Sequence, residues 1–450
     1  MSMRRRPGHL PGPAPRKGQP EGRAVKTLAI IGTGISGLGA AYLLRERFAI
    51  TLYEKNDYPG GHTNTVTVEE AAHTLPIDTG FMVYNEVTYP NLTRLFRELD
   101  VPTKPTSMSF SVQHQLSGIE YNGTSLNLLF GQRSNLLRPR FWRMLHKISR
   151  FNAEAVAFLN DPRCASLTLR QFVQEGGYGE DFLNLYLVPM SSAVWSTPPE
   201  LMLEFPAATL IRFWHNHGFL GLHTQHPWRT VVDGARSYVS KIIALSDARV
   251  CLGRRAASVS RNGSEGKVRV HDEGGSWAEY DKVLLACHAD QSLEILEDPT
   301  PMESAMLRPF RYQPNSVLLH TDATVMPRTK RCWASWNYRI EQTADARIVP
   351  TTHYWMNSLQ GVSERQNYFV SLNASERIAP EKILRGIEYE HPLFNLEAVA
   401  MQRELPRLNR IGPDQTTYFS GAWFKYGFHE DGFTSAVEAA EAISEEALWT

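Results

Sequence analysis

Three glycines and one acid near the start of the chain have the spacing of a dinucleotide-binding site. Gly32, Gly34 and Gly37 form the pattern Gly-x-Gly-x-x-Gly, and Glu54 follows at the distance where an acid is expected. Gly32 permits a tight turn, Gly34 lets backbone approach a pyrophosphate, and Gly37 lets a helix pack closely on a strand. Glu54 can accept hydrogen bonds from ribose hydroxyls, and its charge would repel a 2′-phosphate. These residue types predict dinucleotide binding.

A βαβ unit is needed to bring these residues together. The apolar run 28–31 predicts a buried parallel strand, residues 38–47 continue as a helix, and a second strand leads to Glu54. The free N–H groups around Ile35 and Ser36 at the helix start favour a phosphate charge. A Gly-rich turn in an ordinary α/β domain is the alternative, and the complete unit argues against it.

The overall composition excludes several classes of protein. Lys plus Arg and Asp plus Glu both number 47 in 450 residues, so there is no net charge that would draw in nucleic acid. Residues 28–44 carry no charge, but four glycines interrupt them, so we do not interpret them as a membrane span. The four cysteines form no Cys-x-x-Cys pair, which fits a reducing, cytoplasmic compartment. Residues 1–25 are basic and rich in Pro and Gly, and we expect a disordered tail.

Four histidines crowd into a short stretch, which suggests a metal at first sight. Their spacing matches no established site and no carboxylate or cysteine accompanies them, so we predict pocket-lining or buried histidines and no metal. They are His215, His217, His223 and His226.

The segment after Glu54 resembles a known superfamily. An acid, five residues and then Gly60-Gly61 is similar to the signature of the flavin amine oxidase superfamily, which includes protoporphyrinogen oxidases and phytoene-type desaturases. In that superfamily an Arg usually follows the two glycines, near the flavin phosphates and ribityl chain. Here His62 takes that place. The resemblance implies FAD as cofactor, held by residues of this segment: Lys55, Gly60, Gly61, His62 and Thr63.

Other segments fit the same resemblance. Gly80 and Phe81 correspond to a segment that crosses near the isoalloxazine, and the strand with Ala256 and Val259 to one that lies against adenine. At the C-terminus, a strand ends at Gly421, and a helix begins near Gly432.

The C-terminal helix is implied to place its N–H groups at the flavin pyrimidine edge, where they would stabilise charge on the reduced ring. Gly432, Phe433 and Thr434 are the candidates. Ala422 stands where the superfamily has an Asp. No Cys lies in this loop, so the flavin is expected to be non-covalent.

We therefore predict an α/β protein of the amine-oxidase-like two-domain type. A Rossmann-like FAD-binding domain would comprise residues 26–100, 225–292 and 405–450. An inserted mixed α+β substrate domain would comprise a helical part, 101–224, and an antiparallel sheet, 293–404. We expect a helix over 182–199 that is broken at Pro189. The expected strands include 107–113, 316–320, 332–340, 351–357 and 368–373.

The aromatic supply suggests an apolar substrate pocket. Its candidate wall residues are Trp195, Trp336, Trp355, Trp423 and Tyr426. By their position in the resemblance, His62, His429 and Glu430 are the candidates for a catalytic base.

Four short motifs resemble one subgroup more closely, that of predicted NAD/FAD-binding proteins similar to the N-terminal region of plant cyclopropane fatty acid synthases. The motifs span residues 60–63, 194–198, 390–392 and 427–432. This likeness implies an FAD-dependent oxidoreductase that oxidises or desaturates a hydrophobic substrate, with a modified or unsaturated fatty acyl chain favoured, by hydride transfer to flavin N5.

Two alternatives stay open. One is an amine oxidase acting on a small amine, with Trp423 and Tyr426 as an aromatic cage. The other is a non-catalytic FAD-binding partner of a lipid methyltransferase similar to cyclopropane synthases. The basic, aromatic stretch 138–146 could contact a membrane peripherally, although most such faces are merely solvated.

Overall fold

The computed structural model describes residues 25–71, 73–221, 224–342, 348–412 and 414–450. Except for Val25, the tail predicted to be disordered lies outside the described residues, as does His223 of the histidine cluster. Among the described residues, no helix is both long and apolar enough to cross a membrane.

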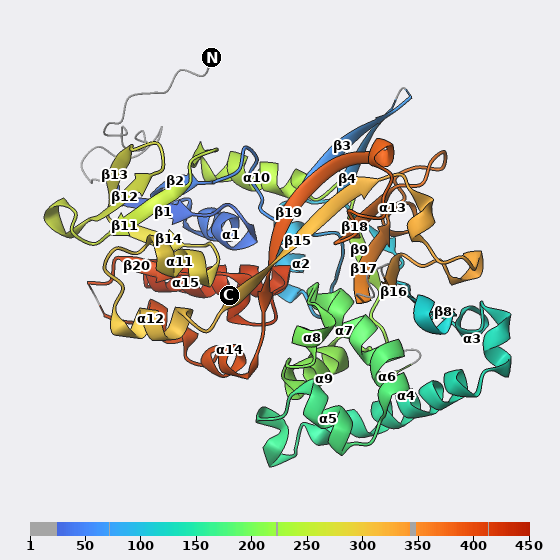
Figure 1. Cartoon of the computed structure of the whole chain (residues 1–450). Coiled ribbons are helices and arrows are strands. Elements are labelled where there is room, and N and C mark those ends of the chain that lie inside the picture. The colour runs from blue at the N-terminus through green and yellow to red at the C-terminus, as the bar shows by residue number, and fades with distance from the viewer. Residues whose placement is uncertain (1–24, 72, 222–223, 343–347, 413) are drawn as a thin grey trace.

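A five-stranded parallel sheet carries the nucleotide-binding motif (Figure 1). Alternation along its strands gives it two buried faces: Leu28 and Ile30 face one core, and Ala29 and Ile31 face the other. Its strands, in spatial order, are β10 (Arg249–Cys251), β2 (Ala49–Tyr53), β1 (Thr27–Ile31), β14 (Lys282–Leu285) and β20 (Thr417–Phe419).

Different elements cover the two faces of this sheet. On the Leu28 face lie α1 (Ile35–Leu44), α10 (Arg236–Ser246) and α15 (His429–Ser444). On the Ala29 face lies an antiparallel sheet of β11 (Ala256–Ser260), β12 (Val268–Asp272) and β13 (Trp277–Tyr280), together with α11 (Ala289–Ile295), α12 (Pro301–Leu307) and α14 (Leu396–Met401). This arrangement is the predicted α/β class.

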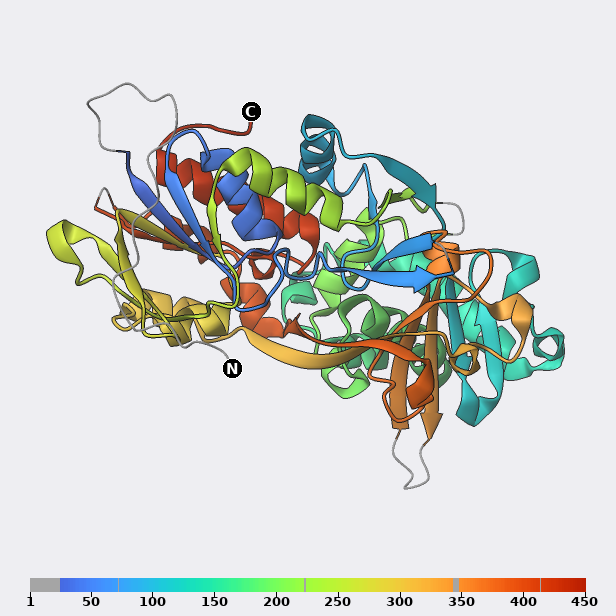
Figure 2. The same ribbon diagram turned by 90° about the horizontal axis from the view of Figure 1, so that it is seen from above.

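A second, seven-stranded sheet forms the other half of the molecule (Figures 1 and 2). Its pairs are antiparallel except for β16 with β7. In spatial order its strands are β19 (Ile383–Leu393), β15 (Arg311–His320), β18 (Phe369–Leu372), β17 (Ile348–Trp355), β16 (Trp336–Gln342), β7 (Phe110–His114) and β8 (Ile119–Asn122). The long strands β15 and β19 run between the two halves.

Helices surround their own apolar core below this sheet (Figure 1). They are α4 (Pro139–Phe158), α5 (Leu169–Glu175), α6 (Glu180–Phe182), α7 (Val188–Trp195), α8 (Pro199–Met202) and α9 (Ala207–Asn216). Smaller elements join the halves: the hairpin β3 (Thr65–Glu70) with β4 (His73–Asp78), the sheet of β5 (Tyr84–Asn85), β9 (Trp228–Val231) and β6 (Thr103–Thr106), and helix α2 (Pro90–Glu98).

Two local predictions were wrong. The helix is not broken at Pro189: helical residues continue from Glu180 to Trp195. A π-helical turn, Leu183–Leu187, stands just before Pro189, where the regular hydrogen-bond pattern is interrupted and a residue without an N–H can be accommodated. The strand expected over 332–340 begins only at Trp336, because a 3-10 turn occupies Lys330–Cys332.

Candidate active site

A cavity of about 440 Å³ is lined by residues of both halves. One end is formed by the β1–α1 turn and the segment after β2. The other end is formed by aromatic and aliphatic side chains of the helices and the seven-stranded sheet. The predicted candidates on its wall are Gly32, Gly34, Ile35, Ser36, Glu54, Lys55, Gly60, Gly61, His62, Gly80, Phe81, Ala256, Gly421, Ala422, His429, Trp195, Trp336 and Trp423.

The glycine turn leaves room for a ligand at one position only. Gly32 has φ +105°, and a Cβ there would lie 2.7 Å from the carbonyl oxygen of Ala286. A Cβ on Gly37 would collide with the carbonyl of Gly32, so α1 packs directly on the turn. A Cβ on Gly34, by contrast, would meet no atom within 4 Å. The backbone at Gly34 thus borders open space, as a pyrophosphate site requires.

Gly60 and Gly61 close the same end of the cavity. Both have positive φ, +114° and +58°, which favours glycine. The Gly60 N–H donates to the Thr33 carbonyl over 3.1 Å, and a Cβ on Gly61 would lie 3.2 Å from the Cα of Gly34. The second motif therefore packs against the first.

Glu54 is held in place by three hydrogen bonds. Its carboxylate accepts from the N–H of Thr33 at 3.2 Å, from the Thr33 hydroxyl, and from the N–H of Asn56 at 2.9 Å. The side chain is buried and lines the cavity. Arg254 and Arg255, which the sequence analysis missed, line the same end; Arg254 forms an ion pair with Asp272. Their position directly before Ala256, which was predicted to lie near adenine, is the feature of the sequence that could have indicated them.

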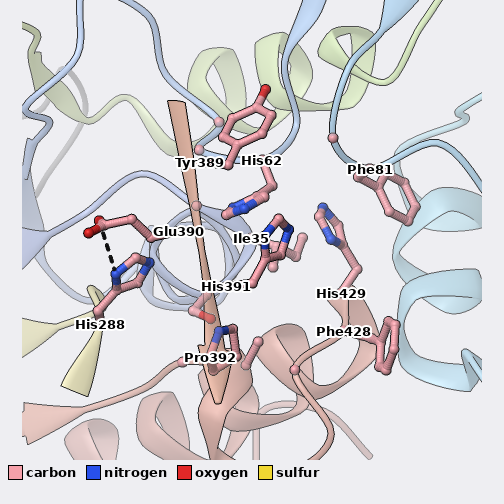
Figure 3. Close-up of a pocket in the computed structure, with 18 of the residues that line it drawn as sticks. Ile35, His62, Phe81, His288, Tyr389, Glu390, His391, Pro392, Phe428 and His429 are labelled. Carbon is pink, nitrogen blue, oxygen red and sulfur yellow. Dashed lines mark ion pairs between the residues drawn. The ribbon is translucent and has the colours of Figure 1, made fainter. Parts of the chain in front are cut away.

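Four histidines from distant segments gather where the two ends of the cavity meet (Figure 3). His62 follows the second glycine pair, His288 follows β14, His391 lies on β19, and His429 begins α15. Only His62 and His429 were predicted. His391 belongs to a quoted motif but was given no role.

Three of the four rings, those of His62, His288 and His429, are stacked on another aromatic ring. The His62 ring stacks on Tyr389 with centroids 4.6 Å apart, and its centroid lies 5.1 Å from that of His391. The His288 ring stacks on Tyr312 at 4.1 Å. Nδ1 of His288 lies 3.6 Å from a carboxylate oxygen of Glu390, the contact dashed in Figure 3.

His429 is also held by hydrogen bonds. It stacks on Phe81 at 3.8 Å, and its Nε2 lies 2.9 Å from the Thr63 hydroxyl and 3.1 Å from the Tyr238 hydroxyl. Thr63 therefore lies behind the wall, where it orients a residue that faces the cavity.

Burial keeps the four imidazoles neutral. It lowers the pKa of His62 to about 4, and the pKa values of His288, His391 and His429 to about 3. At pH 7 each ring therefore has one N–H donor and one acceptor nitrogen.

A chain of amides fixes which nitrogen of His391 is protonated. The backbone N–H of Ser316 donates to Oδ1 of Asn373, so the Asn373 amide nitrogen is the atom that donates to Asn315, at 2.8 Å. The Asn315 amide nitrogen then faces Nδ1 of His391 at 2.9 Å. Nδ1 must accept, and the His391 proton lies on Nε2.

The residues present fit a bound dinucleotide cofactor. Gly34 borders open space, and Glu54 is preset as an acceptor. His62 Nε2 and His288 Nδ1 are buried with no hydrogen-bond partner among the described residues. Such atoms cost free energy unless a ligand or water satisfies them.

Several candidates lie off the wall. Val259 and Phe433 are core residues. A Cβ on Gly432 would lie 2.7 Å from Ile35, so this glycine allows α15 to pack on α1. Thr434 accepts a hydrogen bond from Asn91 at 3.0 Å.

Glu430 caps a helix. Its carboxylate accepts from the backbone N–H groups of Asn91 and Leu92, at 3.0 and 2.9 Å, in the first turn of α2. Its oxygens thus satisfy a helix end, which argues against the role of a base.

Trp355 and Tyr426 also lie off the wall. Trp336 pairs across strands with Tyr354, so these two share the cavity face, and Trp355, the next residue, points to the opposite face, where it packs on Trp333. Tyr426 packs on Phe213.

The short histidine cluster is not a site of its own. His217 stacks on Phe213 at 3.9 Å, and burial lowers its pKa to about 4. His226 bonds to the Asn216 carbonyl, and His215 is exposed. The described part of the chain has no grouping of His, Cys, Asp or Glu suited to a metal ion.

The substrate end of the cavity has no charged side chain among the described residues. Its wall includes Met82, Met108, Val194, Trp195, Phe213, Phe219, Trp228, Trp336, Tyr354 and Leu359. Six charged residues line the rest of the wall: Glu54, Lys55, Arg254 and Arg255 at the nucleotide end, and Glu388 and Glu390 on β19. Strand β19 also belongs to the seven-stranded sheet but runs between the two halves, and a carboxylate oxygen of Glu390 lies 3.7 Å from Nζ of Lys55.

A model of the flavin containing amine oxidoreductase family matches residues 35–366. The chain belongs to this family. It is accordingly an FAD-dependent oxidoreductase, and the predicted superfamily and cofactor are confirmed. A search of the curated proteins found no match. The likeness to cyclopropane fatty acid synthases stays a prediction.

Solved structures of low sequence identity share the fold. Cyclohexylamine oxidase from Brevibacterium oxydans is 16% identical, with TM-score 0.65 over 94% of this chain and 99% of that chain. Putrescine oxidase bound to putrescine is 13% identical, with TM-score 0.64 over 94% and 99%. A CLA-producing fatty acid isomerase from P. acnes is 14% identical, with TM-score 0.63 over 93% and 98%.

Proposed function

We propose that this flavoenzyme oxidises or desaturates a hydrophobic substrate, and that a modified or unsaturated fatty acyl chain is the best candidate. The observation that supports this proposal is the substrate end of the cavity, whose described wall is aromatic, aliphatic and uncharged. A small cationic amine would lose hydration there without gaining a carboxylate partner. An acyl chain gains from every apolar contact.

Trp423 and Tyr426, the aromatic cage expected for an amine oxidase, do not enclose a common space. The indole N–H of Trp423 donates to the Cys287 carbonyl at 3.2 Å, and its ring packs on Phe310. Tyr426 does not line the cavity. The pair therefore does not form two aromatic walls around a substrate nitrogen.

The chain's residues have separable tasks. When bound, the flavin supplies the hydride acceptor. The apolar wall positions the substrate and excludes water. His391 presents an Nε2–H donor, and His62 and His429 are neutral imidazoles that can accept a hydrogen bond from the substrate or the flavin. Their low pKa values make them weak proton acceptors at pH 7.

The anaerobic visible spectrum of the FAD-loaded protein tests this function. Fatty acids or phospholipids, dispersed in detergent, should bleach the flavin band, and small primary and secondary amines should not. Bleaching by amines alone would establish the amine oxidase instead. A protein that neither class bleaches would favour the non-catalytic partner of a lipid methyltransferase.

A further inference from the structure

Exposed apolar side chains are concentrated where α3 (Leu126–Leu129), the 3-10 turn Arg133–Leu137 and the start of α4 adjoin. Leu137 is 87% exposed and Leu126 70%, the two highest values among the described large hydrophobic residues. Leu136 and Trp142 are exposed by about half. We call these four residues, with Arg133 and Arg138, the α3–α4 corner. Isolated exposed leucines need no explanation, but a group of them does.

Local contacts hold the corner together. The Trp142 indole N–H donates to the Leu136 carbonyl at 3.0 Å, and its ring centroid lies 5.2 Å from that of Phe130, which follows α3. Phe141 and Met144, on the opposite side of α4, are fully buried. The inward side of α4 thus fills the core, so the exposed apolar residues are additional to what folding requires.

Positive charge surrounds these side chains. Residues 121–153 contain no Asp or Glu and six cations, Arg133, Arg138, Arg140, Arg143, Lys147 and Arg150, in a chain of zero net charge. Arg140 and Arg143 share Asp181, and Arg150 pairs with Glu154, the first acid after this stretch. Arg133 and Arg138 donate only to neutral groups, the carbonyls of Asn127, Phe130, Ser117 and Gly118 and the Asn127 side-chain oxygen, and the described residues offer them no carboxylate.

We propose that the α3–α4 corner docks on an anionic lipid bilayer. Arginines among exposed leucines and a tryptophan fit the headgroup boundary, where the cations meet lipid phosphates and the apolar groups enter the acyl region. Arginine and tryptophan also occur at protein interfaces, so a protein partner is the alternative that the flotation experiment must exclude.

The position of the corner suits a lipid-handling enzyme. It lies at the end of the molecule away from the parallel sheet (Figures 1 and 2). Phe110, at the start of β7, packs on the cavity residue Trp336, and β7 leads to the turn Gln115–Ser117, whose last carbonyl Arg138 contacts. At ~3.3 Å per residue, β7 places His114, its last residue, about 13 Å from Phe110.

Vesicle flotation of the full-length, FAD-loaded protein tests the docking surface. We expect flotation with vesicles that contain phosphatidylglycerol, much less with pure phosphatidylcholine, and release by NaCl. Leu126→Glu/Leu137→Glu should reduce binding at least tenfold. Arg133→Gln/Arg138→Gln should reduce it on the order of fivefold per charge and weaken its salt dependence.

Leu245→Glu is the matched control, since Leu245 is a 54% exposed leucine on α10, outside the corner. It should float like the wild type. FAD content and melting temperature establish that each variant is folded. Absence of flotation, flotation of the double Glu variant like the wild type, or an equal loss in the control would overturn the proposal and favour a protein partner.

This inference draws on the proposed function only for its choice of lipid, and the two fail separately. Bleaching by dispersed fatty acid without flotation would refute the docking surface alone. Flotation without bleaching would refute the lipid substrate alone.

Discussion

The two ends of the cavity are built in different ways. At the nucleotide end, the ligand space is shaped by backbone: Gly34 borders open space, Gly61 packs against it, and Glu54 is tied to the main chain of Thr33 and Asn56. At the substrate end, the space is shaped by side chains from helices and strands that are distant in sequence.

This difference separates binding from specificity. A cradle made of backbone recognises phosphates and ribose, which every FAD molecule contains. It depends on a few glycines, because only these let the backbone approach the cofactor closely. A wall of side chains selects the substrate and can be altered without disturbing the cradle. The first two changes below each act on one end and should leave the other intact, and the last two act on the histidines between the ends.

The largest expected effect is a loss of FAD affinity, caused by a change at the nucleotide end. Gly34→Val places a side chain in the open space of the cradle without a clash in the protein itself. FAD affinity should fall about tenfold to a hundredfold or more, so the protein should purify nearly colourless. Gly412→Val, at another glycine with no atom near its Cβ, is the control and should stay yellow. Full FAD content in Gly34→Val would contradict this view of the cradle.

The next expected effect is a rise in the KM for the substrate, caused by a change at the substrate end. Val194 lines the cavity from α7, and Val194→Asp puts a carboxylate in the uncharged wall. The KM for an acyl substrate should rise about tenfold, with FAD content unchanged. Val194→Asn has almost the same shape without the charge and should cost less. An equal loss in both variants would show that shape, and not charge, decides.

A spectroscopic change is expected at the histidines between the two ends. Asn315→Asp replaces the amide donor to Nδ1 of His391 by an acceptor, so Nδ1 should gain the proton. The nearby carboxylate should raise the pKa of His391 by roughly 1 to 3 units. Nitrogen-15 NMR of the imidazole reports both changes. Asn373→Ala, one step further along the amide chain, should give a mixture of tautomers. Unaltered His391 signals in both variants would rule out control of the His391 tautomer by the chain of amides.

The last expected effect concerns the pH dependence of stability. Burial lowers the pKa of His288 to about 3. Below about pH 6.5 the unfolded chain therefore binds a proton on this residue and the folded chain does not, so the free energy of unfolding decreases as the pH falls. Each such group therefore removes up to about 1.4 kcal/mol of stability per pH unit as the pH falls.

In His288→Gln, the free energy of unfolding should fall less steeply with decreasing pH, by up to about 1.4 kcal/mol per pH unit between pH 6.5 and pH 4. Groups that act in the opposite direction, such as Asp431 with its pKa raised by burial to about 7, are common to both proteins and cancel. Denaturant unfolding at several pH values measures the difference. Parallel slopes for the two proteins would contradict the buried, neutral state of His288.

The structure explains why two of the predicted site residues lie away from the cavity. Glu430 lies one residue after His429, so the sequence places both at the flavin, but consecutive helical residues point in different directions, and Glu430 faces the start of α2. Trp336 and Trp355 both lie on aromatic strands, but the register of β16 on β17 pairs Trp336 with Tyr354 and sends Trp355 to the other face.

The sequence by itself determined the βαβ unit, the glycine cradle, Glu54, the family and the cofactor. These features depend on residue types at short, fixed spacings, which a strand, a turn and a helix convert directly into geometry. Only the tertiary structure decided that His288 and His391 join His62 and His429, and which leucines of the α3–α4 corner are exposed. The first depends on how separate segments pack and the second on which side of the chain enters the core, and no local spacing in the chain encodes either.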